Sequence, residues 1–361
     1  MVSAGVVRGD TPLPDDRVAH PAVRAGLAVA EVYKRVVTGP LEPMLARSRP
    51  VRRTGFEREV VVAEITPVAD DVVSLTLRCP GGGELTAWQP GSHLDVVLPS
   101  GRQRQYSLCG DPSDRRSYRI AVRRLADGGG GSREIHDDLE VGDVITIRGP
   151  RNAFRLAEAS AYFFVAGGIG ITPILPMVQA AEASGRPWTL VYTGRSRASM
   201  PFLDGLATLR GGALDVRPDD ECGIPDLDEI LADVPRGHAV YVCGPPAMLD
   251  TARTRLAAPD FEVHSERFSA PPVIGGEAFD VELRRSGVTI PVAADQSVLA
   301  AVRDQVPDLA YSCQQGFCGT CVVKVVDGDV EHRDRALLDS EREDSMLICV
   351  SRCSGPLVLD L

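Results

Sequence analysis

The stretch YSCQQGFCGTC, residues 311–321, decides the architecture of the C-terminal part of this 361-residue chain. Its cysteines, Cys313, Cys318 and Cys321, follow the spacing C-x4-C-x2-C, and a further cysteine stands at Cys349. This spacing is typical of a plant-type [2Fe-2S] site, in which four thiolates hold two irons. Such a centre accepts and releases single electrons. The stretch therefore predicts a domain that transfers electrons.

Two glycines inside the stretch support this interpretation. Gly316 and Gly319 allow the backbone to curl and to direct N–H groups at the sulfurs, which offsets the negative charge of a cluster. A zinc site is the competing interpretation, although zinc loops more often pair two C-x2-C knuckles. A disulfide framework fits poorly with nine cysteines in a chain of this length. We expect Cys353 to be a buried bystander rather than a ligand.

The composition is that of an ordinary globular protein with a formal net charge of −11. An acidic chain argues against nucleic-acid binding. No apolar run approaches the ~18 residues that a membrane span needs. Free thiolates for a cluster require a reducing compartment, so we expect a cytoplasmic protein. Residues 278–361 carry 14 acidic against 8 basic side chains, which either steer a basic acceptor or form a solvated surface.

The pattern of hydrophobic residues divides the chain into three domains after an N-terminal extension over 1–53. Residues 54–157 contain six short β-branched runs separated by Gly, Pro and Asp turns, which predicts an antiparallel β-barrel. Residues 158–268 alternate apolar strands with helices, which predicts an α/β domain with a parallel sheet. The Pro- and Gly-rich residues 269–277 form a linker. Residues 278–361 combine a hairpin, a short helix begun by Ser297 and the cysteine stretch.

The N-terminal extension fits none of these domains. Its segment AVRAGLAVAEVYKRVV, residues 22–37, forms an amphipathic helix with basic flanks if it is helical. We expect it to dock onto the protein itself or onto a subunit. Attachment to a membrane surface is the weaker alternative, because Tyr33 is its single aromatic residue.

Two motifs in the barrel point to phosphate and ring binding. Arg104, Tyr106 and Ser107 form R-x-Y-S, and strand alternation places Arg104 and Tyr106 on one face and Ser107 on the other. An arginine holds phosphate, and a tyrosine lies against an aromatic ring system. GGGGS, residues 128–132, precedes a short helical segment and is either a phosphate loop or a flexible hairpin. The two motifs together favour phosphate binding.

Two strand-to-helix turns in the α/β domain point to a nucleotide. GGIGITP, residues 167–173, follows an apolar strand and opens a helix, with Pro173 where a third glycine of the dinucleotide fingerprint would stand. CGPPAM, residues 243–248, repeats the arrangement. In open α/β sheets, ligands bind at the carboxyl ends of the strands. Cys243 is equally well explained as a core residue.

This series of motifs resembles the phthalate dioxygenase reductase family of the ferredoxin–NADP reductase superfamily, which ends in a plant-type [2Fe-2S] ferredoxin domain. The resemblance spans about residues 55–361 and includes PRNAF near residue 150 and the closing LVLDL. It implies a multidomain fold: an antiparallel β-barrel flavin domain, an α/β parallel-sheet nucleotide domain and an α+β (β-grasp) ferredoxin domain. The C-terminal position of the cysteine domain is specific to this family.

The resemblance also implies which residues bind the cofactors. It implies FMN rather than FAD, held by Arg104, Tyr106, Ser107, Ala121, Val122, Arg123, Gly130, Gly131, Ser132 and Thr172, with Phe268 covering the flavin ring. It places Gly168, Gly170, Cys243, Gly244 and Pro245 beside the nicotinamide nucleotide, and the cluster on Cys313, Cys318, Cys321 and Cys349. Two features depart from the family pattern: Gly129 replaces a frequent arginine, and the N-terminal extension has no counterpart.

These sites together predict an oxidoreductase that takes a hydride from NADH and delivers single electrons to a partner, with no catalytic acid or base required. We expect the partner to be the terminal oxygenase or demethylase of a Rieske system. A cytochrome P450 is the alternative acceptor, and a non-catalytic ferredoxin-docking module is a minor alternative. NADPH remains possible as the coenzyme, because Arg195 and Arg197 follow a strand of the nucleotide domain and could meet a 2′-phosphate.

Overall fold

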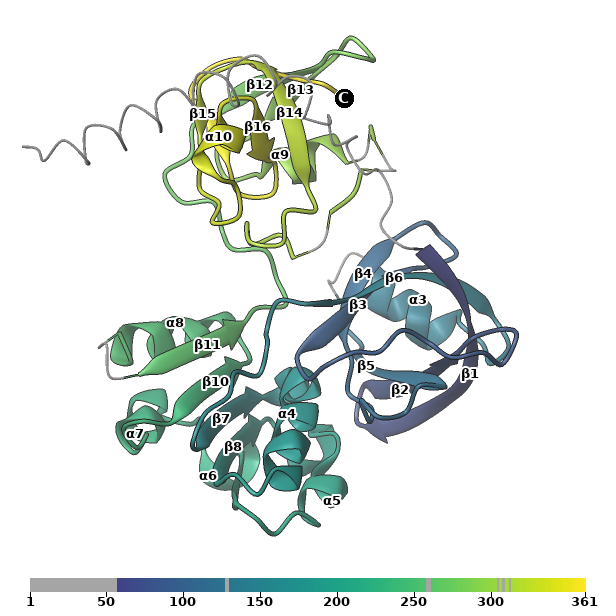
Figure 1. Cartoon of the computed structure of the whole chain (residues 1–361), viewed down its shortest axis with the longest axis vertical. Helices are drawn as coiled ribbons and strands as arrows, with labels where there is room; N and C mark the ends of the chain where they lie inside the picture. Colours follow the sequence, from purple (N-terminus) through teal and green to yellow (C-terminus); the bar gives the residue numbers. More distant parts are fainter. Residues whose placement is uncertain (1–56, 127–129, 258–260, 304, 307–308, 312) are drawn as a thin grey trace, which may run out of the picture. The chain divides into compact units, whose positions relative to one another are not determined.

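The computed structural model describes residues 57–126, 130–257, 261–303, 305–306, 309–311 and 313–361 (Figure 1). The N-terminal extension and Gly129 lie outside these residues, so the expectations for them stay predictions. The described residues form three sheets of five or six strands and one sheet of two strands. Their arrangement agrees with the multidomain fold predicted from the sequence.

The first sheet is the antiparallel barrel. Its six strands have the order β4-β3-β6-β1-β2-β5, and all of their pairings are antiparallel. A bridge between Leu108 and Ile120 joins the chain after β4 to β5 and closes the sheet on itself. The elements are β1 (Glu57–Ala69), β2 (Val72–Arg78), β3 (Ser92–Val97), β4 (Gln103–Ser107), β5 (Ser117–Arg123), α3 (Gly131–Asp137) and β6 (Val144–Asn152).

Alternating side chains fill the barrel. Val60 and Val62 of β1, like Leu75 and Leu77 of β2, are completely buried, whereas the residues between Val60 and Val62 and between Leu75 and Leu77 are partly exposed. This period of two places one face of each strand in a single core, which also includes Leu94, Ile120 and Ile147. The barrel is therefore a packed core that presents its ligand-binding groups at its edges.

The second sheet is parallel and carries five strands in the order β11-β10-β7-β8-β9. The chain runs outward from β7 to β8 and β9 on one side, and then from β10 to β11 on the other. The elements are β7 (Tyr162–Gly167), η2 (Gly168–Gly170), α4 (Ile171–Ala183), β8 (Trp188–Gly194), η3 (Arg197–Ser199), α5 (Leu203–Leu206), β9 (Ala213–Pro218), α6 (Asp219–Cys222), α7 (Leu227–Ala232), β10 (Ala239–Cys243), α8 (Pro246–Arg255) and β11 (Glu262–Glu266).

Helices cover both faces of the parallel sheet. On one face Phe164 and Tyr192 pack with the buried side of α4. On the other face Phe163 and Val165 pack with α7 and α8. Burial on both faces explains why these strands read as continuous apolar runs rather than as alternating ones.

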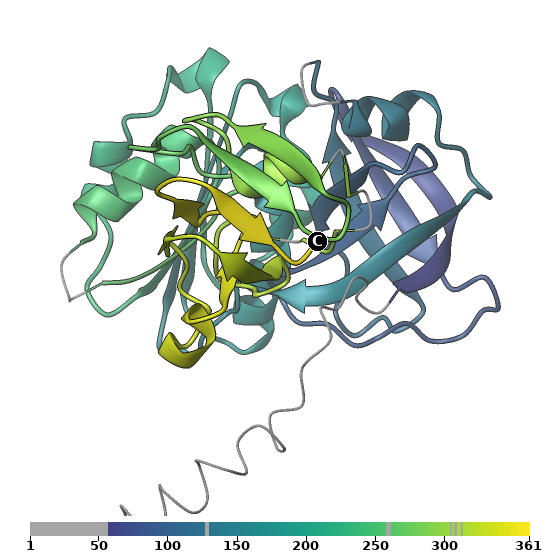
Figure 2. The ribbon, with the colours of Figure 1, turned by 90° about the horizontal axis from the view of Figure 1, so that it is seen from above.

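The third sheet forms the C-terminal domain, coloured green to yellow in Figure 2. Its order is β13-β12-β18-β14-β16, with β12 and β18 parallel and the other pairs antiparallel. The Ser297 hydroxyl accepts a hydrogen bond from the Ala300 N–H, which begins α9 as predicted. The elements are β12 (Phe279–Leu283), β13 (Val288–Val292), α9 (Val298–Val302), β14 (Val322–Asp327), β15 (Val330–Glu331), α10 (Asp339–Arg342), β16 (Ser345–Leu347), β17 (Arg352–Cys353) and β18 (Leu357–Leu359).

Some local features differ from the prediction. The stretch SMPFLDGLATL, residues 199–209, has a helix-like pattern, but only the four-residue α5 forms there. Phe202, just before α5, has a positive φ of 69°, which interrupts the helical backbone. Strands β9 and β11 escaped prediction. Both lie at the edges of their sheet, and the side chains of β9 and β11 are mostly partly exposed, so they lack the apolar signal of the central strands.

None of the helices in the described residues is long and apolar enough to span a bilayer.

A close approach between β10 and α4 depends on one glycine. A Cβ atom at Gly170 would lie 2.2 Å from the Cys243 carbonyl oxygen, whereas a Cβ atom at Gly205 would meet nothing within 4 Å. We predict that Gly170→Ala lowers the free energy of unfolding by about 1–3 kcal/mol, because backbone must shift. Gly205→Ala is the matched control and should be neutral or stabilising by up to about 1 kcal/mol. Urea denaturation measures both, and equal midpoints for the two variants would contradict the prediction.

Candidate functional site

The four predicted cluster ligands form two pairs of thiols. Cys313 is hydrogen-bonded to Cys318, and Cys321 to Cys349. The bond within the first pair lowers the pKa of Cys318 and raises the pKa of Cys313. The two pairs are neighbours, because Cys318 also acts electrostatically on Cys321. The structure thus brings the four predicted ligands together.

Donors from the loop already face these sulfurs. The Gln315 backbone N–H lies 3.3 Å from the Cys313 sulfur, and Thr320 donates from its hydroxyl and its backbone to Cys318. Gly316 and Gly319 have φ values of 78° and 70°, which L-residues rarely adopt. The positive φ values allow the tight curl of the loop that the sequence predicts at these two glycines.

The paired arrangement of the four thiols fits a two-iron cluster. A [2Fe-2S] cluster takes four thiolates shared between two irons. Two adjacent thiol pairs match that requirement, with one pair available for each iron.

The predicted flavin residues gather where β4 meets α3. A Cβ atom at Gly131 would lie 2.7 Å from Arg104 Cγ and from Arg104 Nε, so the arginine packs directly on the glycine. Gly130 precedes the helix with a φ of 82°. Tyr106 lies beside Arg104 and is partly buried, and desolvation raises the pKa of its hydroxyl. This cradle of an arginine, glycines without side chains and a tyrosine fits a flavin phosphate and ring.

Other residues assigned to the flavin lie close by in different roles. Ser132 is buried and accepts a hydrogen bond from the Leu125 N–H at 3.1 Å. Ala121 and Val122 are buried in β5. Arg123 instead reaches the nucleotide domain, where one of its nitrogens lies 3.7 Å from the place a Gly168 Cβ atom would take. Burial lowers the pKa of Arg123, and the positive charge of Arg195 lowers it further. Arg123 thus stands between the two predicted sites.

The predicted nicotinamide residues flank the point where the strand order reverses. Gly168 and Gly170 follow β7, and Cys243 ends β10, its neighbour in the sheet. Such a switch point opens a crevice at the carboxyl ends of the strands. The two turns pack without side chains between them, since a Cβ atom at Gly167 would lie 2.7 Å from the Pro245 ring.

Two residues in this region have structural partners. The Thr172 hydroxyl donates to the Ile169 carbonyl at 2.9 Å within the turn. Cys243 is almost fully buried, and burial raises the pKa of its thiol well above the usual range. A thiol in this state is neutral at ordinary pH, which agrees with its interpretation as a core residue.

Comparison with known proteins extends these assignments. A family model for the 2Fe-2S iron-sulfur cluster binding domain matches residues 281–354, and a model for the oxidoreductase FAD-binding domain matches residues 59–156. The phenoxybenzoate dioxygenase subunit beta of Ectopseudomonas oleovorans is 42% identical over 302 residues, which cover 81% of this chain and 92% of that protein.

Two solved structures are similar over most of the chain. An intact type IV self-sufficient cytochrome P450 monooxygenase is 42% identical with a TM-score of 0.68, covering 91% of this chain and 44% of its own. Phthalate dioxygenase reductase is 36% identical with a TM-score of 0.65, covering 84% of this chain and 98% of its own. The chain belongs to the phthalate dioxygenase reductase family. It is an NAD(P)H-dependent oxidoreductase with a flavin and a [2Fe-2S] centre.

One residue of this reductase that the sequence did not reveal is Glu266, the last residue of β11. The Ser107 hydroxyl donates to its carboxyl group at 3.4 Å, and burial raises the pKa of Glu266 to about 8. The same carboxyl group contributes to the raised pKa of Cys243. Glu266 thus connects the flavin strand β4 with the nucleotide crevice. The sequence feature that could have identified Glu266 is its position two residues before Phe268.

Phe268 itself follows β11 with 52% of its side chain exposed. The neighbouring Arg267 is nearly buried and donates to the Asp250 carboxylate at 2.8 Å. Because the ion pair fixes Arg267, the exposed aromatic side chain of Phe268 beside it is available to cover a bound ring. Its placement next to Glu266 is compatible with the predicted role at the flavin.

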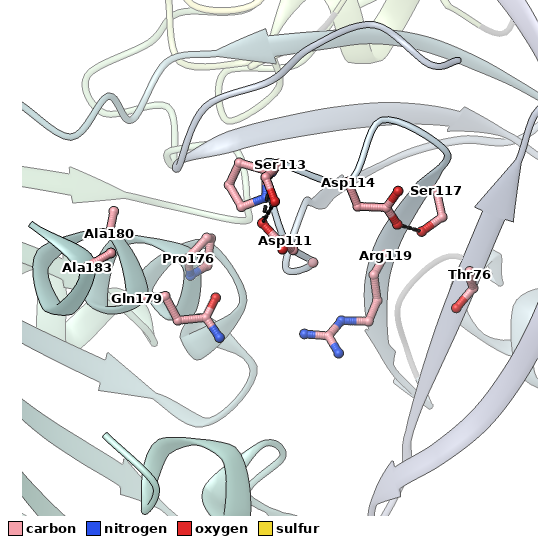
Figure 3. Close-up of a pocket in the computed structure, with 12 residues that line it drawn as sticks. Thr76, Asp111, Ser113, Asp114, Ser117, Arg119, Pro176, Gln179, Ala180 and Ala183 are labelled. Atoms are coloured by element: carbon pink, nitrogen blue, oxygen red, sulfur yellow. Dashed lines mark hydrogen bonds between the residues drawn. The ribbon is translucent and has the colours of Figure 1, made fainter. Parts of the chain in front are cut away.

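A pocket of about 700 Å³ lies elsewhere in the reductase, between the loop after β4 and helix α4 (Figure 3). The residues that line it include none of the predicted cofactor residues. Its charged groups have local partners: Asp111 accepts from Ser113, Asp114 from Ser117, and Arg119 donates to the Cys109 carbonyl. The charged side chains of this pocket are thus occupied by local hydrogen bonds.

The cysteines of the reductase supply a matched pair for a test. Cys353 is buried in β17, and its thiol donates to the Pro356 carbonyl at 3.7 Å, away from the thiol pairs. We predict that Cys349→Ser loses nearly all bound iron and visible cluster absorbance, because one iron lacks a ligand. Cys353→Ser should keep the iron content of the wild type, at a cost of about 1 kcal/mol in stability. Iron loss in Cys353→Ser with retention in Cys349→Ser would contradict the assignment.

The raised pKa of the Glu266 carboxyl group predicts a dependence of stability on pH. The unfolded chain releases the Glu266 proton near pH 4.5, whereas the folded protein holds it up to about pH 8. The folded state binds more protons in this range, so its stability falls as the pH rises. Glu266→Gln removes the effect, and the wild type should lose stability relative to this variant between pH 5 and about pH 8.

Urea denaturation of the loaded protein at several pH values measures this difference. Glu282→Gln, which alters an exposed glutamate of β12, is the control and should follow the wild type. Parallel pH profiles for the wild type and Glu266→Gln would show that the carboxyl group is already ionised in the folded protein.

Proposed function

We propose that this protein is the NADH-dependent reductase of a Rieske-type oxygenase or demethylase, with FMN and a [2Fe-2S] cluster on Cys313, Cys318, Cys321 and Cys349. The observation that carries the proposal is the contact between Ser107 and Glu266. Hydride transfer needs the reacting atoms about 3–3.5 Å apart. This contact joins the predicted flavin strand to the edge of the predicted nucleotide crevice, as such a transfer requires.

A flavin supplies the conversion between a two-electron hydride and single electrons. The chain supplies the surroundings. Arg104 on Gly131 would hold the phosphate, the partly buried Tyr106 would lie against the ring, and Phe268 would cover it. The turns after β7 and β10 hold the nicotinamide nucleotide at the switch point. We assign the flavin domain to residues 54–157, the nucleotide domain to 158–268, the linker to 269–277 and the ferredoxin domain to 278–361.

Reduction potentials support a Rieske centre as the final acceptor. A plant-type cluster lies near about −400 mV, and Rieske centres span about −150 to +300 mV. A drop of at least about 250 mV favours one-electron transfer by about four powers of ten, at about 59 mV per decade. The acceptor therefore draws electrons from the cluster without further input of energy.

The similarity to known systems supports an oxygenase partner and leaves two kinds in competition. The relative from Ectopseudomonas oleovorans carries the name of a dioxygenase subunit, and this chain spans 92% of it. The self-sufficient cytochrome P450 monooxygenase is the observation in favour of a P450 acceptor, although this chain spans only 44% of that protein. We favour the Rieske acceptor because the resemblance extends over the full length of dioxygenase components.

The choice of NADH rests on the partner of Arg197. Its Nε lies 2.8 Å and 3.0 Å from the two carboxylate oxygens of Glu221, so one of the two arginines that could bind a 2′-phosphate is already paired. Asp219 and Asp220 stand beside Glu221 in α6 and repel a phosphate further. This acidic corner accepts ribose hydroxyls more readily than a phosphate group.

We predict that the wild type uses NADH with a higher catalytic efficiency than NADPH, and that Glu221→Gln raises the efficiency with NADPH about tenfold. The variant frees Arg197 for a charge-assisted hydrogen bond, which accounts for a change of this size. Asp228→Asn is the control, since it breaks a similar exposed pair with Arg255 in the same domain. Steady-state kinetics with both coenzymes measure the ratio, and a wild-type preference for NADPH would contradict the assignment.

A reconstitution experiment tests the proposed partner. The loaded reductase is mixed with a Rieske oxygenase and, separately, with a cytochrome P450, and NADH-dependent product formation is measured for each. We expect turnover with the Rieske protein. Turnover with the P450 alone would replace the first proposal by the second. An absence of NADH-driven bleaching of the flavin would instead support a non-catalytic docking module.

A further inference from the structure

The cysteine loop is attached to the rest of the protein by two glutamine side chains. One glutamine lies in the barrel and reaches toward the loop, and the other lies in the loop and reaches outward. Each attachment falls one residue away from a predicted flavin residue. Neither glutamine belongs to the predicted ligand sets.

The first attachment is made by Gln103, the first residue of β4. Its amide nitrogen donates to the Tyr311 carbonyl at 3.0 Å, two residues before the ligand Cys313. Its amide oxygen accepts from Arg148 at 2.6 Å, and Arg148 is itself paired with Glu57. Because a guanidinium group only donates, the arginine fixes the amide with its nitrogen directed at the loop. Gln103 is the residue before Arg104.

Tyr311 supports the same contact through its side chain. Its ring packs against the core of the ferredoxin domain, and Arg104, Asp95 and Arg148 of the barrel act electrostatically on its hydroxyl. Tyr311 therefore contacts both domains, with its carbonyl held by Gln103.

The second attachment is made by Gln315, which lies between the ligands Cys313 and Cys318. Its amide nitrogen donates to the Arg267 carbonyl at 2.9 Å, and its backbone N–H faces the Cys313 sulfur. Arg267 is anchored by Asp250 and directly precedes Phe268. One residue thus contacts a cluster ligand through its backbone and the flavin-covering segment through its side chain.

We propose that Gln103 and Gln315 are positioning residues that hold the cysteine loop against the flavin site and so set the rate of electron transfer between the two centres. The inference rests on the proposed flow of electrons from flavin to cluster. Domains joined within one chain move relative to each other unless their interface is large and apolar. Electron transfer slows steeply as the separation grows, so the population of the docked loop controls the rate.

The variants Gln103→Met and Gln315→Met test this role. Methionine keeps the length of the side chain and introduces no charge, and in Gln315→Met the backbone N–H that faces Cys313 is retained. Gln305→Met is the matched control, because Gln305 is an exposed glutamine of the same domain. Iron content and the electron paramagnetic resonance spectrum of the reduced cluster establish that each variant holds an intact cluster.

Two readouts separate positioning from a general loss of structure. In stopped-flow mixing with NADH, each variant should reduce the flavin at the wild-type rate and the cluster about fivefold more slowly, the effect of one lost hydrogen bond on docking. Hydrogen–deuterium exchange of the oxidised, loaded protein should increase over residues 309–318 and stay unchanged in β12 and β13. Gln305→Met should match the wild type in both.

The outcomes are distinguishable. Unchanged cluster reduction and unchanged exchange in both variants would overturn the inference while leaving the proposed function intact. Slower cluster reduction without faster exchange would also overturn it, since the loop would then still be docked. If NADH fails to reduce the cluster even in the wild type, the proposed function itself is wrong.

Discussion

Three residues of strand β4 make the contacts that link the three predicted sites of this protein. Gln103 binds the cysteine loop, Arg104 packs on the glycine of the flavin cradle, and Ser107 donates to Glu266 at the nucleotide crevice. A strand advances about 3.3 Å per residue, so these contacts lie along about 13 Å of backbone. Their order along the strand matches the proposed path of electrons from nucleotide to flavin to cluster.

The strand can serve three sites because its surroundings are rigid. The barrel closes through Leu108 and Ile120, just beyond the end of β4, and the parallel sheet is buried on both faces. Glu266 adds a partly buried carboxyl group with a raised pKa at the junction of the two domains. A neutral acid there keeps negative charge away from a site that must accept a hydride, which agrees with the proposed chemistry.

Much of this organisation could be predicted from the sequence, because the informative features are local. The cysteine spacing, the glycine turns and the alternation of apolar residues each act within a few positions, and the cap at Ser297 was found in the same way. Glu266, Gln103 and Gln315 escaped prediction because their meaning lies in contacts distant in sequence. The edge strands β9 and β11 were missed for lack of apolar residues.

The central claim is that a single chain converts a hydride into single electrons that leave through the four C-terminal cysteines. Rapid-freeze electron paramagnetic resonance after anaerobic mixing of the loaded wild-type protein with NADH tests it most directly, with flavin absorbance followed in parallel. We expect the flavin to bleach first and the signal of a reduced [2Fe-2S] cluster then to grow as electrons reach the cluster. A flavin that stays reduced while no cluster signal develops would contradict it.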